Sequence, residues 1–360
     1  MPPIYQTSTY VQDAVGSPKL GYDYSRVSNP TRDALQANLA ALEIGRHGMA
    51  FASGLAAIEA LLKAVLSAGD HLVCGADVYG GVDRMLRHVW SRFGIEVDFV
   101  DTTDLEALRS AVRPETKLIH VETPSNPMMT VTDIEGCSEI ARESGCLLSV
   151  DNTFATPYLQ RPLELGADVV MHSTTKFLNG HSDMIGGALI TDSDDLADQL
   201  RFQQKTTGAV PGPFDCWLVL RGTKTLHLRM RAHCKNARRV ASLLDGHAEV
   251  QGTNYPGLPS HPQHELSSRQ MSDFGSMVSF EIGSAERARA FAGSTRIFAL
   301  AESLGGVESL VSVPAEMTHA SVPDEKRREI GLTPGLVRLS VGVEDGDDLL
   351  EDLEAALAAL

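Results

Sequence analysis

The segment STTKFLNGHSD, residues 173–183, directly follows the apolar run ADVVMH, residues 167–172. The run is short, rich in β-branched residues and preceded by a glycine, which predicts a buried strand that ends just before Ser173. Open α/β sheets bind their ligands beyond the carboxyl ends of their strands. The sequence therefore predicts that Lys176, with hydroxyl groups at Ser173 and Thr175, lies at a ligand site.

This arrangement suits a cofactor that carries both an aldehyde and a phosphate. Lys176 would form a Schiff base with the aldehyde, and Ser173 and Thr175 would bind the phosphate. A surface lysine in a loop of serine and threonine has the same letters, so this interpretation depends on the remaining parts of such a site elsewhere in the chain.

Length and composition limit the possible classes of protein. At 360 residues the chain exceeds the usual size of one domain, which favours two domains with separate cores. The net charge of −16 disfavours a general affinity for nucleic acid or for anionic membranes. No apolar run approaches the roughly 20 residues of a membrane span, and the first residues resemble no leader peptide. We therefore expect a soluble, cytoplasmic protein.

Cysteine and histidine give no sign of a metal site. The five cysteines include no C-x-x-C pair, and their odd number argues against a full disulfide framework. The twelve histidines lack the spacing of known ligand motifs. We therefore expect no metal.

Helical and strand patterns alternate from about residue 30 to residue 200, which predicts a mostly parallel, doubly wound sheet covered by helices. Asn29 and Pro30 are suitable as the N-cap and first residue of a helix whose apolar face is Leu35, Leu39 and Leu42. A second helix is expected at 54–67. The expected strands are 71–74, 96–100, 117–121, 147–150, 169–171 and 188–191.

The pattern changes after about residue 220. A long helical stretch at 223–244 precedes a turn-rich segment at 254–262. Strands are expected at 277–282 and 336–341, and an amphipathic helix ends the chain. This order predicts a smaller α+β domain.

Asp151 ends the apolar run 147–150, which places a carboxylate at the mouth of a buried strand. Burying an unpaired carboxylate is costly, whereas pairing with a protonated pyridine nitrogen offsets much of that penalty. Such a pair makes a pyridine cofactor an effective electron sink. A helix cap formed by Asp151 is the alternative.

A phosphate needs hydrogen-bond donors, and the first turn of a helix provides free backbone N–H groups. Gly54 and Leu55 would provide them in the segment ASGLAA, residues 52–57, although an ordinary serine-capped helix reads the same way. Tyr24 and Arg26 add a phenol and a guanidinium that matches phosphate oxygens. A solvated turn with aromatic packing is the alternative there.

Three further side chains extend the candidate site. Tyr79, in the strand-end segment 77–81, could stack on a planar cofactor and transfer a proton. Asn126, in the segment 122–127, offers a polar contact, although Asn-Pro is also an ordinary turn signal. Arg338 interrupts an otherwise apolar strand, which favours an anionic partner such as a substrate carboxylate, with a structural ion pair as the alternative.

In this order the motifs resemble those of the cysteine/methionine metabolism family of pyridoxal-phosphate-dependent enzymes, the trans-sulfuration enzymes. The resemblance runs essentially from end to end, and it implies the aspartate aminotransferase fold, known as fold type I. It implies an N-terminal arm at 1–24 for subunit contacts, a cofactor-binding domain at 25–220 and a small C-terminal domain at 221–360. The motifs that carry it are YSR (24–26), NPTR (29–32), SGLAA (53–57), DVYGG (77–81), ETPSNP (122–127), DNTF (151–154), residues 173–183, GAVPGP (208–213), YPGL (255–258), AESLGGVES (301–309) and RLSVG (338–342).

The resemblance assigns a role to each candidate residue. Lys176 would carry the Schiff base to pyridoxal 5′-phosphate, Asp151 would pair with the ring nitrogen, and Tyr79 would stack on the ring. The residues implied to bind the phosphate are Gly54, Leu55, Ser173 and Thr175, and those implied to hold an amino-acid substrate are Asn126, Ser303 and Arg338.

The resemblance also implies an oligomer. Tyr24 and Arg26 would reach the phosphate of a neighbouring subunit, which implies a dimer with shared active sites and usually a homotetramer. Family members generally carry some tens of residues before the segment that matches Pro3 to Tyr5, and this arm helps to clasp neighbouring subunits. Because this sequence begins almost at that point, the resemblance implies the dimer more firmly than the tetramer.

Within the family, the resemblance is greatest to cystathionine γ-lyase and γ-synthase. Glu302 lies where these enzymes carry an acid suited to the distal ammonium of cystathionine, and Asp23 and Arg84 are further candidates for that end of the substrate. Gly81 occupies a position that is typically cysteine in methionine γ-lyases.

The implied activity is γ-elimination of L-cystathionine to cysteine, 2-oxobutyrate and ammonia. The same residues serve γ-replacement on an O-acyl-homoserine, as well as the cystathionine β-lyase and methionine γ-lyase reactions, so these alternatives stay open. A protein that binds the cofactor without activity is disfavoured because the whole reactive set is present.

Overall fold

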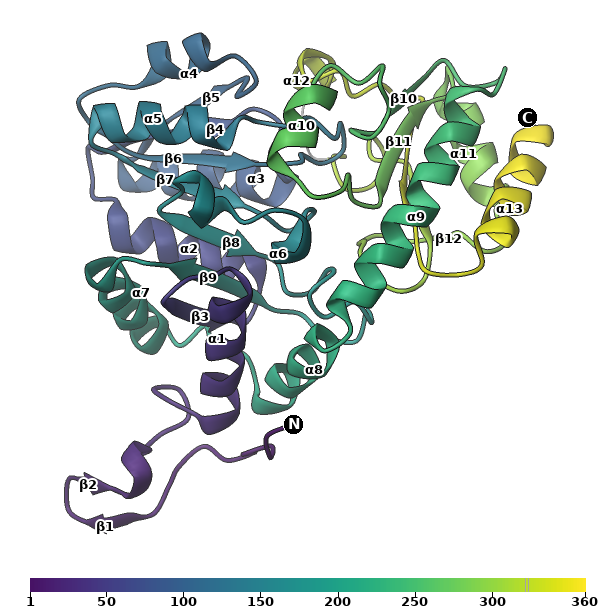
Figure 1. The fold of residues 1–360 in the computed structure, drawn as a ribbon. Coiled ribbons are helices and arrows are strands. Elements are labelled where there is room, and N and C mark those ends of the chain that lie inside the picture. The colour runs from purple at the N-terminus through teal and green to yellow at the C-terminus, as the bar shows by residue number, and fades with distance from the viewer. Residues whose placement is uncertain (321, 323) are drawn as a thin grey trace.

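Two sheets organise the protein in the computed structural model, which describes residues 1–320, 322 and 324–360 (Figure 1). The strands of a seven-stranded sheet lie between residues 47 and 191, and those of a five-stranded sheet between residues 252 and 340. The N-terminal residues form an extension that projects away from both sheets and contains a ribbon of β1 (Gln12–Ala14) and β2 (Ser17–Pro18).

The seven-stranded sheet has the order β3-β9-β8-β7-β6-β4-β5. β9 runs antiparallel to both of its neighbours, and the other neighbouring pairs are parallel. The expected mostly parallel sheet is confirmed. Its strands are β3 (His47–Phe51), β4 (His71–Gly75), β5 (Glu96–Val100), β6 (Thr116–Glu122), β7 (Leu147–Asp151), β8 (Val169–His172) and β9 (Gly187–Thr191).

Helices cover both faces of this sheet, as a doubly wound arrangement requires. Side chains alternate along β8, so that Val169 and Met171 pack towards α2 (Gly54–Val65), whereas Val170 packs towards α1 (Pro30–Leu42). The remaining helices of this part are α3 (Gly80–His88), α4 (Leu105–Ala111), α5 (Ile134–Ser144), α6 (Thr156–Leu159), α7 (Asp194–Thr207) and α8 (Pro213–Thr223).

The start of α1 is the one expected from the sequence. The Asn29 side chain accepts hydrogen bonds from the backbone N–H groups of Thr31 and Arg32 at 3.0 and 3.4 Å, and Pro30 is the first helical residue. Leu35 and Leu39 are buried against the sheet. Local signals therefore specified the start and the apolar face of this helix.

Two local expectations differ from the structure. β3 was not expected, because His47 and Gly48 give it little β-propensity. The long helix expected at 223–244 is instead the end of α8 followed by α9 (Leu226–Asp245), since Thr225 has a non-helical backbone. Neither the start of β3 nor the break at Thr225 is marked by a proline or by a run of charged residues.

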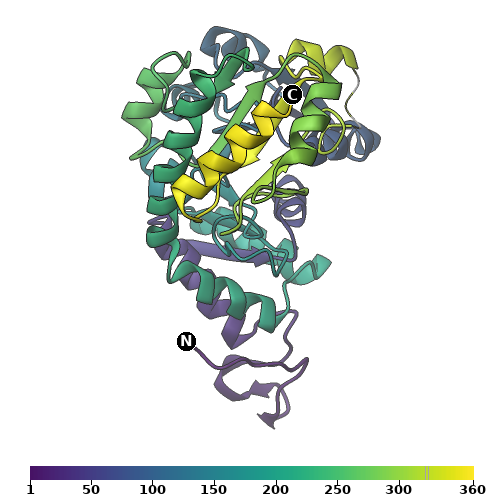
Figure 2. The same ribbon diagram turned by 90° about the vertical axis from the view of Figure 1, so that its right-hand side faces the viewer.

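The five-stranded sheet has the order β10-β11-β14-β13-β12, and β12 with β13 is its parallel pair. Helices α9, α11 and α13 cover one face (Figure 2), while the other face carries polar side chains such as Arg338 and Ser340. The expected smaller α+β unit is thus confirmed. Its elements are β10 (Gly252–Asn254), α10 (His264–Gln270), β11 (Met277–Glu281), α11 (Ala285–Ser294), β12 (Ala299–Leu300), β13 (Leu310–Ser312), α12 (Asp324–Glu329), β14 (Leu336–Ser340) and α13 (Gly346–Ala358).

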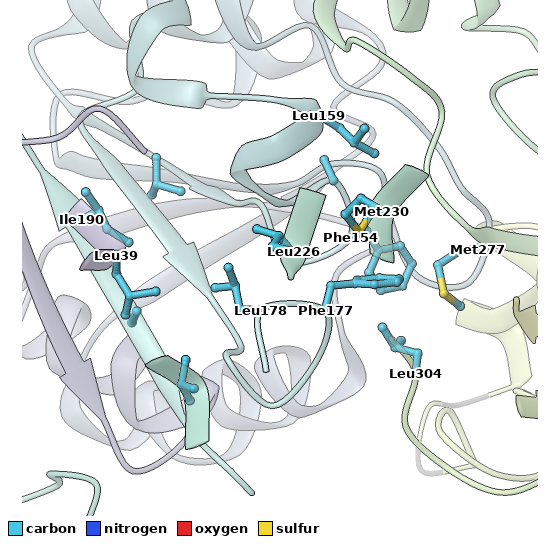
Figure 3. Packing of buried hydrophobic residues seen from close by; sticks show 14 of the residues in the cluster. Leu39, Phe154, Leu159, Phe177, Leu178, Ile190, Leu226, Met230, Met277 and Leu304 are labelled. Carbon is cyan, nitrogen blue, oxygen red and sulfur yellow. The ribbon is translucent and has the colours of Figure 1, made fainter. Parts of the chain in front are cut away.

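A hydrophobic cluster joins the two sheets (Figure 3). Phe177, which follows β8, is fully buried and packs in one cluster with Met230 of α9, Met277 of β11 and Leu304. The packing fixes the segment after β8 relative to the five-stranded sheet, because well-packed interiors resist deformation. Within the described residues, no helix is both long enough and apolar enough to cross a membrane.

Gly48 explains how β3 can pack so closely beneath α1. A Cβ atom at this position would lie 2.4 Å from the carbonyl oxygen of Gln36 in α1 and 3.3 Å from the backbone nitrogen of Ala40. We expect Gly48→Ala to destabilise the protein by about 2 kcal/mol, because backbone atoms must move apart. Thermal unfolding of the purified variant would measure this loss.

Gly293 is the matched control for this substitution. It lies in α11, and a Cβ atom there would meet no atom within 4 Å. Gly293→Ala should therefore leave stability unchanged or raise it by up to about 1 kcal/mol through helix propensity. Equal destabilisation by the two substitutions would contradict the explanation.

Candidate active site

A cleft of about 820 Å³ opens at the carboxyl ends of β4, β6, β7 and β8 and is closed on its other side by residues of the five-stranded sheet. Most of the residues expected from the sequence line it. They are Gly54, Leu55, Tyr79, Asn126, Asp151, Ser173, Thr175, Lys176, Glu302, Ser303 and Arg338.

Four expected residues do not line this cleft within a single chain. Asp23, Tyr24 and Arg26 belong to the N-terminal extension, where the Arg26 guanidinium lies over the Tyr24 ring at 5.4 Å and donates to the carbonyl oxygen of Lys205 at 2.5 Å. Arg84 is exposed on α3. Their assignment to a site stays a prediction.

Lys176 is the reactive centre of the cleft. Its Nζ atom donates a hydrogen bond of 2.7 Å to the hydroxyl oxygen of Ser303. Burial and, to a smaller extent, the charge of Arg338 together lower the pKa of Lys176 to about 8, while Glu302 opposes the shift. A substantial fraction of this amine is therefore neutral near pH 8, as a nucleophile or proton acceptor must be.

Close backbone packing holds Ser303 against Lys176. Ser303 has a φ of 85°, in the left-handed region that strains a residue with a side chain. A Cβ atom at Gly305 would lie 2.7 Å from the backbone nitrogen of Phe177, so the chain can approach this closely because residue 305 has no side chain. The core position of Phe177 and the turn around Gly305 thus place the lysine and its partner.

Asp151 is buried at the end of β7. Its Oδ1 atom accepts hydrogen bonds from the backbone N–H and the hydroxyl of Thr153, at 3.0 and 2.5 Å. Burial raises the pKa of Asp151, while these two bonds and the nearby His172 oppose that rise. Both bonds use Oδ1, which leaves Oδ2 for a cationic partner such as a ring nitrogen in the cleft.

The start of α2 provides a cradle for a phosphate. Ser53 caps the helix by accepting from the N–H of Ala56 at 3.0 Å, which leaves the N–H groups of Gly54 and Leu55 in the first turn for a ligand. A Cβ atom at Gly54 would lie 3.2 Å from the Cβ atom of Ser173 and would fill the cradle. The residues present therefore fit a phosphate with a neighbouring aldehyde and ring nitrogen.

Arg338 supplies a buried cation on the far side of the cleft. Its Nη1 atom donates to Oδ1 of Asn126 at 2.7 Å and its Nη2 atom to the carbonyl oxygen of Ser303 at 3.0 Å. Burial lowers the pKa of Arg338 to about 10, which still leaves it charged at neutral pH. Its Nε atom has no hydrogen-bond partner among the described residues, so the guanidinium can still accept an anion.

Two buried polar residues of the site were not expected from the sequence. Thr153 links Asp151 to β8, because its hydroxyl oxygen also accepts from the backbone N–H of Ser173 at 2.8 Å. Glu122 ends β6 as Asp151 ends β7, and it accepts a hydrogen bond from the backbone N–H of Tyr79 at 2.8 Å. Its place at the end of an expected strand was the signal that could have identified it.

No group of three or more His, Cys, Asp or Glu side chains in the described part of the chain could hold a metal ion. The cleft contains a buried lysine of lowered pKa, a carboxylate at the end of a neighbouring strand and a helix start that fits a phosphate. These features define the class of protein, an α/β enzyme that uses pyridoxal 5′-phosphate.

Comparisons with known proteins identify the family. The family model described as Cys/Met metabolism PLP-dependent enzyme matches residues 1–358, and the chain belongs to this family.

Similar proteins within the family catalyse different reactions. The chain is 54% identical over 355 residues to a cystathionine γ-lyase of Bacillus subtilis and 54% identical over 355 residues to a cystathionine β-lyase of Lactococcus lactis, and each match covers 99% of this chain and 93% of the relative. A solved cystathionine γ-synthase from Xanthomonas oryzae, in complex with aminoacrylate and cysteine, has 46% identity and a TM-score of 0.97, covering 99% of this chain and 92% of that one. These similarities establish the family and the cofactor, but they do not distinguish among the γ-lyase, β-lyase and γ-synthase reactions.

The lowered pKa of Lys176 predicts how cofactor uptake depends on pH. A neutral amine is needed to attack the aldehyde, so the rate at which the apoprotein takes up pyridoxal 5′-phosphate should rise with pH and level off above about 8. With an ordinary lysine, the rate of uptake would continue to rise until about pH 10.4. Stopped-flow absorbance of the bound cofactor would measure the profile.

Two variants test that assignment. Lys176→Ala should abolish both turnover and the visible absorption band of the Schiff base. Lys224→Ala changes an exposed lysine at the end of α8 and should leave the profile unchanged. A midpoint at the ordinary lysine pKa, or the Schiff-base absorption band in Lys176→Ala, would contradict the assigned role.

Proposed function

We propose that the protein is a carbon–sulfur lyase that cleaves L-cystathionine by γ-elimination. One molecule of water is consumed, and the products are cysteine, 2-oxobutyrate and ammonia. The observation that carries the proposal is that Glu302 and Arg338, which are opposite in charge, line one cleft and both act on the pKa of Lys176. L-Cystathionine has a carboxylate at the end where it reacts and an ammonium at its distal end, so it can satisfy both charges.

Each residue then has a defined task in the reaction. Arg338 and Asn126 hold the α-carboxylate of the substrate, because the guanidinium is buried and can still bind an anion. The bound cofactor supplies an electron sink for the negative charge left at Cα. Lys176 removes the proton from Cα and moves protons along the substrate carbon chain, and the Tyr79 hydroxyl protonates the departing sulfur.

γ-Replacement is the second candidate reaction. It uses the same residues, and the similarity to the solved γ-synthase extends over 99% of the chain. The two reactions part after the sulfur leaves, when either water or a thiol reacts. The β-lyase and methionine γ-lyase reactions are further alternatives. Gly81 argues against the second of these, because methionine γ-lyases typically have cysteine at this position and a Cβ atom there would lie 2.4 Å from the Tyr79 ring.

We further propose a homodimer with shared active sites that assembles into a tetramer in the cytoplasm. Tyr24 and Arg26 lie outside the cleft of their own chain, on an extension that also exposes Val11, Val15 and Leu20 to solvent. Apolar side chains of this kind favour burial against another subunit. The five cysteines are buried and unpaired, which suits a reducing compartment.

The identity of the keto acid formed from L-cystathionine tests the proposal. γ-Elimination gives 2-oxobutyrate, whereas β-elimination gives pyruvate, and mass spectrometry separates the two. We expect 2-oxobutyrate and free cysteine in equal amounts. Pyruvate would overturn γ-elimination in favour of β-elimination, and cystathionine formed from an O-acyl-homoserine and cysteine, with no keto acid from L-cystathionine, would favour the synthase.

Glu302→Gln tests how the distal ammonium is recognised. Removing one partner of a partly exposed ion pair should raise KM for L-cystathionine about fivefold and leave kcat almost unchanged. An analogue that lacks the distal amino group should show no such difference between the wild-type protein and the variant. Equal effects on both substrates would contradict the role assigned to Glu302.

A further inference from the structure

Two buried carboxyl groups lie side by side at the base of the cleft. Glu122 of β6 and Asp151 of β7 are direct partners in the parallel ladder, so their side chains leave the sheet on the same face. Both line the cleft, with exposed fractions of only 8% and 7%. Two ionised carboxylates so placed would repel each other strongly, and therefore one proton is readily held between them.

Hydrogen bonds decide which carboxyl group holds that proton. Asp151 accepts from both the backbone N–H and the hydroxyl of Thr153, which favours its charged form. Burial raises the pKa of Glu122 well above its usual range, and repulsion from Asp151 adds to that rise, against the smaller effect of hydrogen bonds from the backbone of Tyr79 and Asn126. The negative charge therefore rests on Asp151, where a cofactor ring nitrogen needs it.

The other charged groups around Glu122 do not reverse this order. Asp77, on the loop after β4, is a further, partly buried carboxyl group that repels charge at Glu122. Arg338 is the nearby cation, but it donates to Asn126 and to the carbonyl oxygen of Ser303. Among the described residues, no ion pair involves Glu122.

Glu122 also fixes the residue that covers the cofactor. Its Oε2 atom accepts the backbone N–H of Tyr79 at 2.8 Å, directly before α3 begins at Gly80. The Tyr79 ring is partly exposed in the cleft, so its position depends on the backbone to which it is attached. A neutral carboxyl group accepts this bond as an ionised one does.

We propose that Glu122 is a positioning residue that remains protonated beside an ionised Asp151 and, in that form, anchors the backbone of Tyr79. It keeps the base of the cleft free of a second buried negative charge beside Asp151, which would compete with the substrate carboxylate for Arg338. The inference rests on the proposed placement of the cofactor ring against Asp151 and Tyr79. It does not depend on which carbon–sulfur bond is cleaved.

Three variants test whether residue 122 must be a neutral group that accepts the hydrogen bond from Tyr79. Glu122→Gln reproduces the shape and neutrality of the protonated acid and should keep the affinity for pyridoxal 5′-phosphate, kcat and KM within about twofold of the wild type. Glu122→Ala leaves the Tyr79 N–H without a partner and should weaken cofactor affinity about tenfold. Glu122→Asp keeps the carboxyl group but is too short to reach Tyr79, so it should resemble the alanine variant.

Two measurements on the apoprotein read the proton directly. The infrared difference between the wild type and Glu122→Gln should show the carbonyl stretch of a protonated carboxylic acid at neutral pH. Because the folded pKa of Glu122 is raised, the wild type should lose stability as pH rises from the ordinary glutamate range towards the folded pKa, and Glu122→Gln should lack this loss. Glu115→Gln, at an exposed glutamate just before β6, is the matched control and should behave as the wild type.

A Glu122→Gln protein that fails to fold, or that binds the cofactor as weakly as Glu122→Ala, would overturn the inference, as would the absence of the infrared signal. Failure of the proposed function gives a different result. If the apoprotein shows the protonated acid but L-cystathionine yields no 2-oxobutyrate, Glu122 keeps its role and γ-elimination is wrong. If 2-oxobutyrate forms but Glu122 is ionised, γ-elimination is supported and the role proposed for Glu122 is wrong.

Discussion

The hydroxyl group of Thr153 is the link on which the geometry of the site depends. It donates to Asp151 at the end of β7 and accepts from the backbone N–H of Ser173 just after β8. One side chain thereby ties the carboxylate to the start of the segment that carries Lys176. Since the first of these hydrogen bonds is buried and the second is partly buried, a misplaced strand end would leave polar groups unpaired at a substantial cost in free energy.

Packing fixes the same segment from its other end. Phe177 enters the cluster between the two sheets directly after Lys176, and Leu304 enters it directly after Ser303 (Figure 3). The lysine and its hydroxyl partner are each adjacent in sequence to a core residue, so the core sets the 2.7 Å distance between them. The strained backbone of Ser303 persists because the surrounding packing outweighs its cost.

The sequence predicts those features that local signals specify. Lys176 and Asp151 were found because each follows a recognisable apolar strand, and α1 because its cap and first turn are local. Glu122 contributes to the site because β6 lies beside β7, and β3 packs beneath α1 because Gly48 lets the helix approach. These pairs of neighbours, β6 with β7 and β3 with α1, cannot be inferred from spacing along the chain. Tyr24 and Arg26 were expected at a site, but they do not line the described cleft of their own chain.

The distribution of charge in the cleft follows from its depth. Burial works against the charges at the base of the cleft, so it lowers the pKa of Lys176 and of Arg338 and raises that of Asp151 and of Glu122. Arg338 stays charged because guanidinium starts from so high a pKa, and the two hydrogen bonds from Thr153 favour the charged form of Asp151. On the proposed assignment this leaves one cation for the substrate carboxylate and one anion for the cofactor ring. Glu122 is left neutral, and because the pKa of Lys176 is about 8, a substantial fraction of its amine is neutral near pH 8, as proton transfer at Cα requires.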